Sequence, residues 1–126
     1  MTKTKLIAYW ATTVLIALVV LSGGVMQLVH QRDAVEGIVH LGYPLYFVTI
    51  LGFWKLAGGL AILVPKFPRL KEWAYAGIFI ELTGASASHL AVGDPVGNVI
   101  APLVLAGLVV ASWALRPPSR VLGKAM

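Results

Sequence analysis

Two side chains of opposite charge interrupt the apolar segments of this sequence, and they are the residues best suited to chemistry. Lys55 lies within the apolar run of residues 43–64, and Glu81 lies within a second run at residues 73–90. An isolated charge at the centre of a bilayer costs about 2.5–3.5 kcal/mol, so such residues usually pair or mark a path for ions, protons or substrates. We therefore predict that Lys55 and Glu81 pair inside a membrane.

Helix geometry places both charges at a similar depth. Lys55 lies about ten residues from the end of its run and Glu81 about nine from the start of its run, which puts both at roughly 14 Å, close to the bilayer midplane. The short connection between the runs predicts antiparallel neighbouring helices. Three interpretations remain open: an ion pair that fixes helix register, a pair that borders a ligand pocket and binds substrate or passes protons, and side chains that reach the membrane surface or pair elsewhere.

Other polar residues gather near the membrane boundary beyond these charges. Ser88 follows Glu81 at helical spacing, and His89 lies beside it. Gln27 lies near the end of the first apolar run, and His30 follows that run directly. The candidate ligand or ion-pair site therefore consists of Lys55, Glu81, Ser88, His89, Gln27 and His30.

The histidines suggest two further chemistries. Imidazole can ligate zinc, copper or iron. The spacing of His30, His40 and His89 matches no zinc signature, and no helix carries the HExxH pattern, so we predict no metal site. A quinone headgroup bound among Gln27, His30 and His89 is an alternative. The aromatic residues that would line its slot are Tyr43, Tyr46 and Phe47.

The composition indicates a single membrane domain over residues 1–126. The chain is 59% hydrophobic and 12% charged, about half the charged fraction of ordinary soluble domains, and its mean hydropathy is +0.86. The net charge of +5 comes from basic residues in short segments that flank the apolar runs, which favours an anionic lipid surface over nucleic acid as the partner. Cysteine is absent, so thiol nucleophiles, disulfide exchange and thiolate metal sites are excluded.

Hydrophobic periodicity predicts an all-α, four-helix transmembrane bundle with helices at about residues 6–29, 43–64, 73–90 and 95–115. The first run is too long for a signal peptide and no small-residue cleavage site clearly follows it, so we interpret it as a retained helix. Gly52, Lys55 and Gly59 share one face of the second helix, which directs Lys55 toward protein. Residues 30–42 and 65–72 are expected to be polar connections, and residues 91–94 a tight turn.

The distribution of positive charge predicts the orientation. Eight Lys and Arg residues lie at the termini and in the connection of residues 65–72, whereas the remaining connections contain only Arg32. The eight are Lys3, Lys5, Lys66, Arg69, Lys71, Arg116, Arg120 and Lys124. This asymmetry predicts a multi-pass protein of the plasma membrane with both termini in the cytoplasm.

Several segments of the sequence resemble the DoxX-like family of small bacterial membrane proteins: LGYPLYF, ILGFWKLAGGLAIL, LKEWAYAG, GASASH and ASWALRPPSR. The similarity extends over nearly the whole chain. It implies a four-helix bundle in the bacterial inner membrane, with Lys55, Glu72, Glu81, Ser88 and His89 at recurrent positions. The family takes its name from a subunit associated with a quinone-reducing thiosulfate-oxidation system, and other relatives are linked to oxidative-stress complexes. Most members have no established activity.

Three functions fit these features. The first is an accessory or scaffold component of a membrane-associated quinone-linked redox or oxidative-stress system, which implies a membrane redox partner. The second is a quinone- or small-molecule-binding membrane enzyme whose pocket surrounds Lys55 and Glu81. The third is a transporter, which would require a homo-oligomer because the spans are few for a monomer. No nucleophile triad, phosphate-cradling loop or dinucleotide fingerprint is present, so no catalytic residue is assigned.

Overall fold

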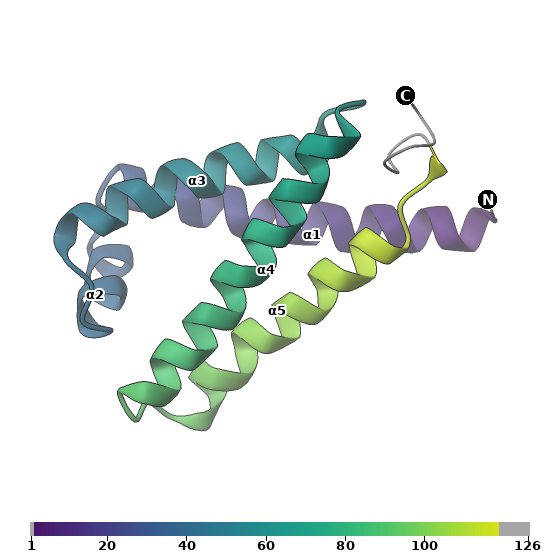
Figure 1. The fold of residues 1–126 in the computed structure, drawn as a ribbon. Helices are drawn as coiled ribbons and strands as arrows, with labels where there is room; N and C mark the ends of the chain where they lie inside the picture. Colours follow the sequence, from purple (N-terminus) through teal and green to yellow (C-terminus); the bar gives the residue numbers. More distant parts are fainter. Residues whose placement is uncertain (1, 119–126) are drawn as a thin grey trace.

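The structure is a computed structural model that describes residues 2–118. These residues form five α-helices (Figure 1): α1 (Lys3–Leu28), α2 (Arg32–His40), α3 (Leu45–Leu63), α4 (Pro68–Ala91) and α5 (Val96–Ala114). No strand occurs in this described range, so the predicted all-α class is confirmed. The predicted cytoplasmic residues Arg120 and Lys124 lie outside it.

The helices are arranged as two pairs that cross each other. α1 packs along α3, and α4 packs along α5, while the two pairs diverge toward one side of the molecule (Figure 1). α2 and the α4–α5 turn lie at this diverging side, which we call the α2 end. The beginning of α1, the end of α5 and the α3–α4 connection lie at the opposite side, which we call the terminal end.

Glycines allow α1 and α3 to approach closely. A Cβ on Gly24 would lie 2.9 Å from the carbonyl oxygen of Gly52, closer than real Cβ contacts. Gly59 extends the interface, because a Cβ at that position would lie 2.7 Å from the Leu21 side chain. Gly52 and Gly59 are both buried, so the predicted small-residue contact face of this helix is confirmed.

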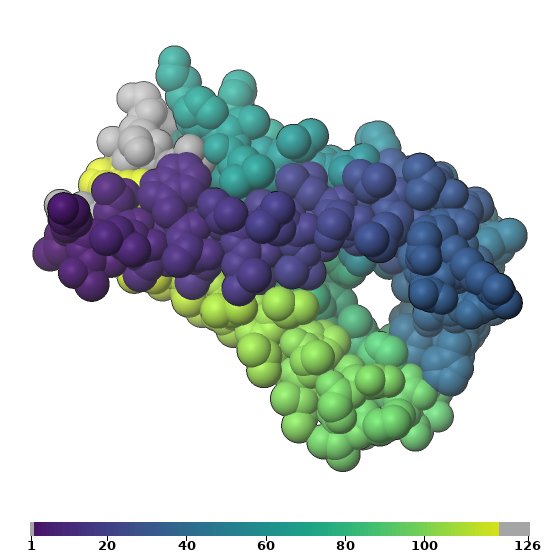
Figure 2. All heavy atoms as spheres, turned by 180° about the vertical axis from the view of Figure 1, so that it is seen from behind, coloured from purple at the N-terminus to yellow at the C-terminus, as the bar shows by residue number. Residues whose placement is uncertain are grey.

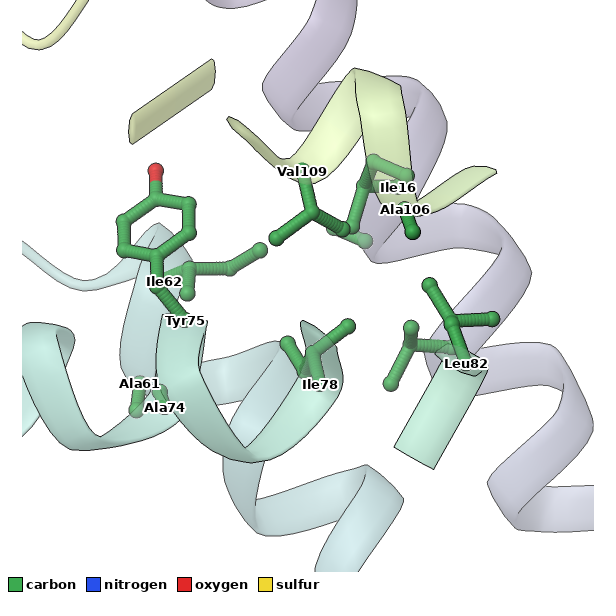
Figure 3. Packing of buried hydrophobic residues seen from close by; sticks show 11 residues of the cluster. Ile16, Ala61, Ile62, Ala74, Tyr75, Ile78, Leu82, Ala106 and Val109 are labelled. Atoms are coloured by element: carbon green, nitrogen blue, oxygen red, sulfur yellow. The ribbon is translucent and has the colours of Figure 1, made fainter. Parts of the chain in front are cut away.

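The hydrophobic core lies where the two pairs cross (Figure 3). Its larger members include Ile16 of α1, Ile62 of α3, Ile78 of α4 and Val109 of α5. Tyr75 also packs in this cluster, and its hydroxyl group lies 2.8 Å from the Oγ of Ser112. The core therefore joins all four long helices, and the buried Tyr75 hydroxyl group has a hydrogen-bonding partner there.

The predicted count of four helices is wrong, because residues 30–42 are more than a connection. They contain α2, whose N-terminus is capped by the Gln31 side chain accepting a hydrogen bond from the backbone N–H of Ala34. Arg32 and Glu36 form an ion pair of 3.1 Å on its exposed face. The polar residues that suggested a loop are the solvent-facing side of a short amphipathic helix.

The predicted start of α4 at residue 73 is also wrong, because the helix begins at Pro68. Proline fits the first helical position, where its missing N–H would have no helical partner. The chain reverses just before it, where Lys66 and Phe67 adopt left-handed backbone angles with φ of 67° and 55°. The two prolines in this segment therefore end one helix and start the next within a very short connection.

Lys71, predicted to lie in the basic connection of residues 65–72, is instead part of α4 and is fully buried. Its ammonium group donates hydrogen bonds to the carbonyl oxygens of Ala61 at 3.0 Å and Lys66 at 2.7 Å, and also to that of Val64. These carbonyl groups lie at or just beyond the C-terminal end of α3, where a helix leaves acceptors unsatisfied and favours positive charge. Lys71 thus joins the start of α4 to the end of α3.

Within the described residues, three helices are long and apolar enough to cross a membrane: α1, α3 and α5. Only 17–28% of the residues in their apolar segments are buried, so most of these side chains face outward, as a lipid solvent requires. α4 has 24 residues and therefore sufficient length, but it carries Glu72, Glu81 and His89.

Candidate functional site

An ion pair between α3 and α4 forms the centre of the candidate site. The Nζ of Lys55 lies 3.2 Å from the Oε1 of Glu81, and their side chains are 18% and 22% exposed. The predicted pairing is therefore present in the structure. Gly23 of α1 lies beside the ammonium group, because a Cβ there would be in ordinary van der Waals contact with the Nζ of Lys55, at 3.5 Å.

An apolar cleft of about 470 Å³ lies on one side of this ion pair, between α3 and α4. We call it the tryptophan cleft, because Trp54 and Trp73 line it and are largely exposed. Gly58 and Gly77 also line it, which leaves space that larger side chains would fill. Its other lining residues are Phe47, Leu51, Lys55, Ala57, Ala61, Leu70, Ala74, Ile78, Ile80 and Glu81.

A second cleft of about 390 Å³ lies between α2, α3 and α4 and is more polar. We call it the α2 cleft. Its lining residues are Asp33, Ala34, Gly37, Ile38, Leu41, Tyr43, Phe47, Leu51, Lys55, Glu81, Gly84, Ala85, Ser88 and His89. Lys55 and Glu81 line both clefts, so one ion pair borders the more polar α2 cleft and the strongly apolar tryptophan cleft.

The divergence of the helix pairs leaves an opening in the side of the molecule. Figure 2 shows this opening between the dark-blue α2 and the green segments of α4 and α5, below α1. The same separation of α2 from the second helix pair shapes the α2 cleft.

At the α2 end, one carboxylate group contacts two histidine side chains and thereby links α2 to α4 and the α4–α5 turn. Asp94, in the α4–α5 turn, places its Oδ1 2.7 Å from the Nε2 of His40 and its Oδ2 2.6 Å from the Nδ1 of His89. A carboxylate only accepts hydrogen bonds, so each histidine presents an N–H to Asp94. The hydrogen bonds from His89 and then from His40 hold the pKa of Asp94 below its usual range.

Two hydroxyl groups that line the α2 cleft are hydrogen-bonded to each other. The Oη of Tyr43 lies 2.7 Å from the Oγ of Ser88, which in turn donates a hydrogen bond of 2.8 Å to the carbonyl oxygen of Gly84. Because Ser88 gives its proton to that carbonyl, Tyr43 is the donor between the two hydroxyl groups. Ser88 and His89, both predicted site residues, therefore lie in the α2 cleft with Lys55 and Glu81.

Two predicted site residues lie elsewhere. His30 is exposed and its Nε2 lies 2.8 Å from the Oγ1 of Thr49, so it belongs to the contact between the end of α1 and α3. Gln27 is only 5% exposed. Its Oε1 has no hydrogen-bond partner among the described residues, and its Cβ faces Gly52 at the α1–α3 interface. Neither residue lines the two clefts.

His40, Asp94 and Tyr43 were not among the predicted residues of the candidate site. His40 was considered as a metal ligand and Tyr43 as an aromatic residue of a quinone slot. The signal that could have found them is the presence of complementary polar groups in two connections on the same predicted side. Across residues 2–118, no group of three His, Asp or Glu side chains is arranged to hold a metal ion.

A third polar cluster joins α4 and α5 at the terminal end. The Oε2 of Glu72 accepts a hydrogen bond of 3.0 Å from the Nε1 of Trp113, and its Oε1 pairs with Arg116. The Arg116 guanidinium also lies 5.0 Å from the centre of the Trp113 ring. Glu72 is thus used to hold the two helices together, away from both clefts that contain Lys55 and Glu81.

Comparison with known proteins gives the family. The model of the DoxX-like family matches residues 11–112, which include both clefts and the ion pair between them. This chain belongs to the DoxX-like family. A relative of this DoxX-like protein from Bacillus subtilis (strain 168) is the uncharacterized protein YdgD, which is 31% identical over 76 residues. The matched segment covers 60% of this chain and 67% of the relative. No solved structure matches this chain.

Proposed function

We propose that this DoxX-like protein binds the polar head of a lipid-soluble small molecule at the Lys55–Glu81 pair, as an accessory component of a quinone-linked redox system in the bacterial inner membrane. The observation that carries the proposal is that Lys55 and Glu81 line both the more polar α2 cleft and the apolar tryptophan cleft. An amphiphilic molecule needs that combination, because its head requires hydrogen-bonding groups and its chain requires apolar surface.

The arrangement in the membrane follows from the helices and the charges. In this proposal α4 is a fourth span beside α1, α3 and α5, because pairing of Glu81 with Lys55 offsets the cost of placing its charge in lipid. The terminal end carries Lys3, Lys5, Lys66, Arg69 and Arg116, and the α2 end carries Arg32. The terminal end therefore faces the cytoplasm.

The residues of the α2 cleft suit a quinone. The Lys55 ammonium can donate a hydrogen bond to a carbonyl oxygen of the headgroup, while Phe47 and Tyr43, whose rings are stacked at 4.9 Å, offer an aromatic surface. A bound quinone would supply the electron-accepting chemistry. The protein contributes orientation, hydrogen bonding and a water-poor environment at Lys55 and Glu81.

Native mass spectrometry of gently purified protein with a short-chain alkyl benzoquinone tests this proposal. The double variant Lys55→Met/Glu81→Leu removes both charges together, so no unpaired charge is left buried. We expect the wild type to retain the quinone and this variant to lose it. The matched control, Arg32→Ala/Glu36→Ala, removes an exposed ion pair and should bind like the wild type. Equal binding by all three proteins would refute the proposed site.

Transport is a second candidate function, favoured by the position of the ion pair between two clefts. A charged pair between compartments is typical of a path for protons or substrates. Lowering of a transmembrane proton gradient by the protein in liposomes, and loss of that effect in Glu81→Gln, would favour transport over simple binding. This function would also predict a homo-oligomer in the same mass spectra.

A further inference from the structure

We propose that His40 and Asp94 form a latch that closes the α2 cleft toward the aqueous side, and that the latch tightens as the solution becomes more acidic. This inference rests on the proposed function, because the cleft that the latch closes is part of the proposed binding site. It concerns how water and soluble molecules reach Lys55 and Glu81.

One face of α2 forms a wall of the α2 cleft. Asp33, Ala34, Gly37 and Ile38 line the cleft, and their spacing places them on one side of the helix. No residue of α2 is buried. The helix packs on α1 and α3, which belong to one helix pair, and reaches the other pair through the contact between His40 and Asp94. That contact, together with the Tyr43–Ser88 hydrogen bond just after α2, therefore joins α2 to the second helix pair.

Asp94 is held in place by α4, on the side of the α2 cleft opposite α2. His89 of α4 contacts its Oδ2 at 2.6 Å, which leaves Oδ1 for His40 at 2.7 Å. The Asp94 side chain is only 10% exposed, whereas that of His40 is 57% exposed. His89 therefore fixes the position of the Asp94 carboxylate. His40 belongs to α2, so a movement of α2 would make or break the contact between His40 and Asp94. The Tyr43–Ser88 hydrogen bond crosses the same gap just after α2.

The contact should strengthen on acidification. Because its hydrogen bonds to His89 and His40 lower the pKa of Asp94, the carboxylate stays ionised from pH 8 to pH 5. Histidine side chains gain positive charge over this range. The hydrogen bond to Asp94 then becomes a charged pair, which is the stronger of the two forms.

The surrounding charges do not reverse this direction. On α2, Asp33 lines the cleft and carries a negative charge, while Arg32 is paired with Glu36. On α3 and α4, Lys55 and Glu81 neutralise each other deeper in the cleft. The first turn of α5 contains no acidic residue. The pH response of the latch is therefore set by the two histidines and Asp94.

Labelling of a single cysteine in the cleft tests the latch. The chain has no cysteine, so Ala85→Cys gives one reactive thiol in the lining of the α2 cleft. The full-length protein in lipid nanodiscs is treated with a water-soluble, membrane-impermeant maleimide, with and without His40→Ala. The ratio of the two labelling rates is taken at each pH, so that the pH dependence of the thiol reaction cancels.

We expect His40→Ala to raise the labelling rate about 1.5- to fivefold at pH 7, as for loss of a solvent-exposed charged contact. The ratio should increase between pH 8 and pH 6. His30→Ala is the matched control, because His30 is exposed but bonds Thr49 instead of Asp94, and it should leave the rate unchanged. Asp94→Asn should also raise the rate, since it removes the anion that both histidines contact.

A ratio of one at every pH for His40→Ala would overturn the latch. A ratio that decreases on acidification would overturn its proposed pH response. His40 is exposed, so its substitution should not prevent folding even if Asp94→Asn does. The labelling needs no ligand. Failure to retain a quinone would thus reject the proposed function without touching the latch, and a unit ratio would reject the latch alone.

Discussion

A Cβ on Gly24 of α1 would lie 2.9 Å from the carbonyl oxygen of Gly52 on α3, and a Cβ on Gly52 would lie 2.9 Å from the carbonyl oxygen of Gly24. The two backbones are therefore in direct contact at this crossing. Lys55 follows Gly52 by one helical turn, and its ammonium group lies beside Gly23. The close glycine contact between α1 and α3 therefore lies one helical turn from the Lys55–Glu81 ion pair.

The first prediction concerns this crossing. Gly24→Ala should destabilise the protein by about 1–3 kcal/mol, because the added methyl group meets backbone atoms that cannot rotate away. Thermal unfolding in detergent measures the effect. Gly107→Ala in α5 is the control, since nothing lies within 4 Å of a Cβ there. That change should be neutral or should stabilise by up to about 1 kcal/mol. Equal stability of the two variants would contradict direct backbone contact.

The second prediction concerns the ion pair. Lys55→Glu or Glu81→Lys alone should cost about 3–5 kcal/mol, because each leaves a partly buried charge without its partner and beside a like charge. The double reversal, Lys55→Glu with Glu81→Lys, should restore most of the folded protein recovered from membranes. Size-exclusion profiles and thermal unfolding measure both effects. Alanine substitutions at both positions that leave expression and stability unchanged would show that the pair carries no folding energy.

The third prediction concerns the end of α3. Lys71→Met keeps the apolar stem but removes the ammonium group that bonds three carbonyl oxygens. We expect a loss of about 2–3 kcal/mol, as for hydrogen bonds made by a buried charged group. Arg69→Met removes an exposed positive charge two residues away and should change stability by less than about 0.5 kcal/mol. Similar unfolding temperatures for the two variants would contradict the role of Lys71 in joining α3 to α4.

The fourth prediction follows from the lowered pKa of Asp94. A carboxyl group whose pKa is lower in the folded state stabilises the protein above its unfolded pKa, and this contribution is lost as the pH falls through the folded value. The wild type should therefore unfold at a higher temperature than Asp94→Asn at pH 6. The difference should shrink below about pH 4. Glu36→Gln, in an exposed pair, should show a much smaller difference. A gap that widens on acidification below pH 4 would contradict the lowered pKa.

Helix periodicity and helix rise were sufficient to predict the ion pair. The positions of Lys55 and Glu81 within their apolar runs gave their depth, and the short connection made their helices neighbours. The contact face of α3 was also predictable, because Gly52 and Gly59 recur at helical spacing. These properties depend on distance along one helix axis, which the order of residues specifies directly.

The arrangement around the pair came only from the tertiary structure. His40, His89 and Asp94 lie in different segments, and they meet because the two helix pairs diverge at the α2 end and α2 fills part of the gap. Lys71 is buried because the connection before it reverses within a few residues of left-handed backbone. The crossing of helix pairs depends on how side chains from distant segments fit together, which no local pattern encodes. Sequence therefore placed the two opposite charges at one depth, whereas packing between non-adjacent helices formed the clefts on either side of them.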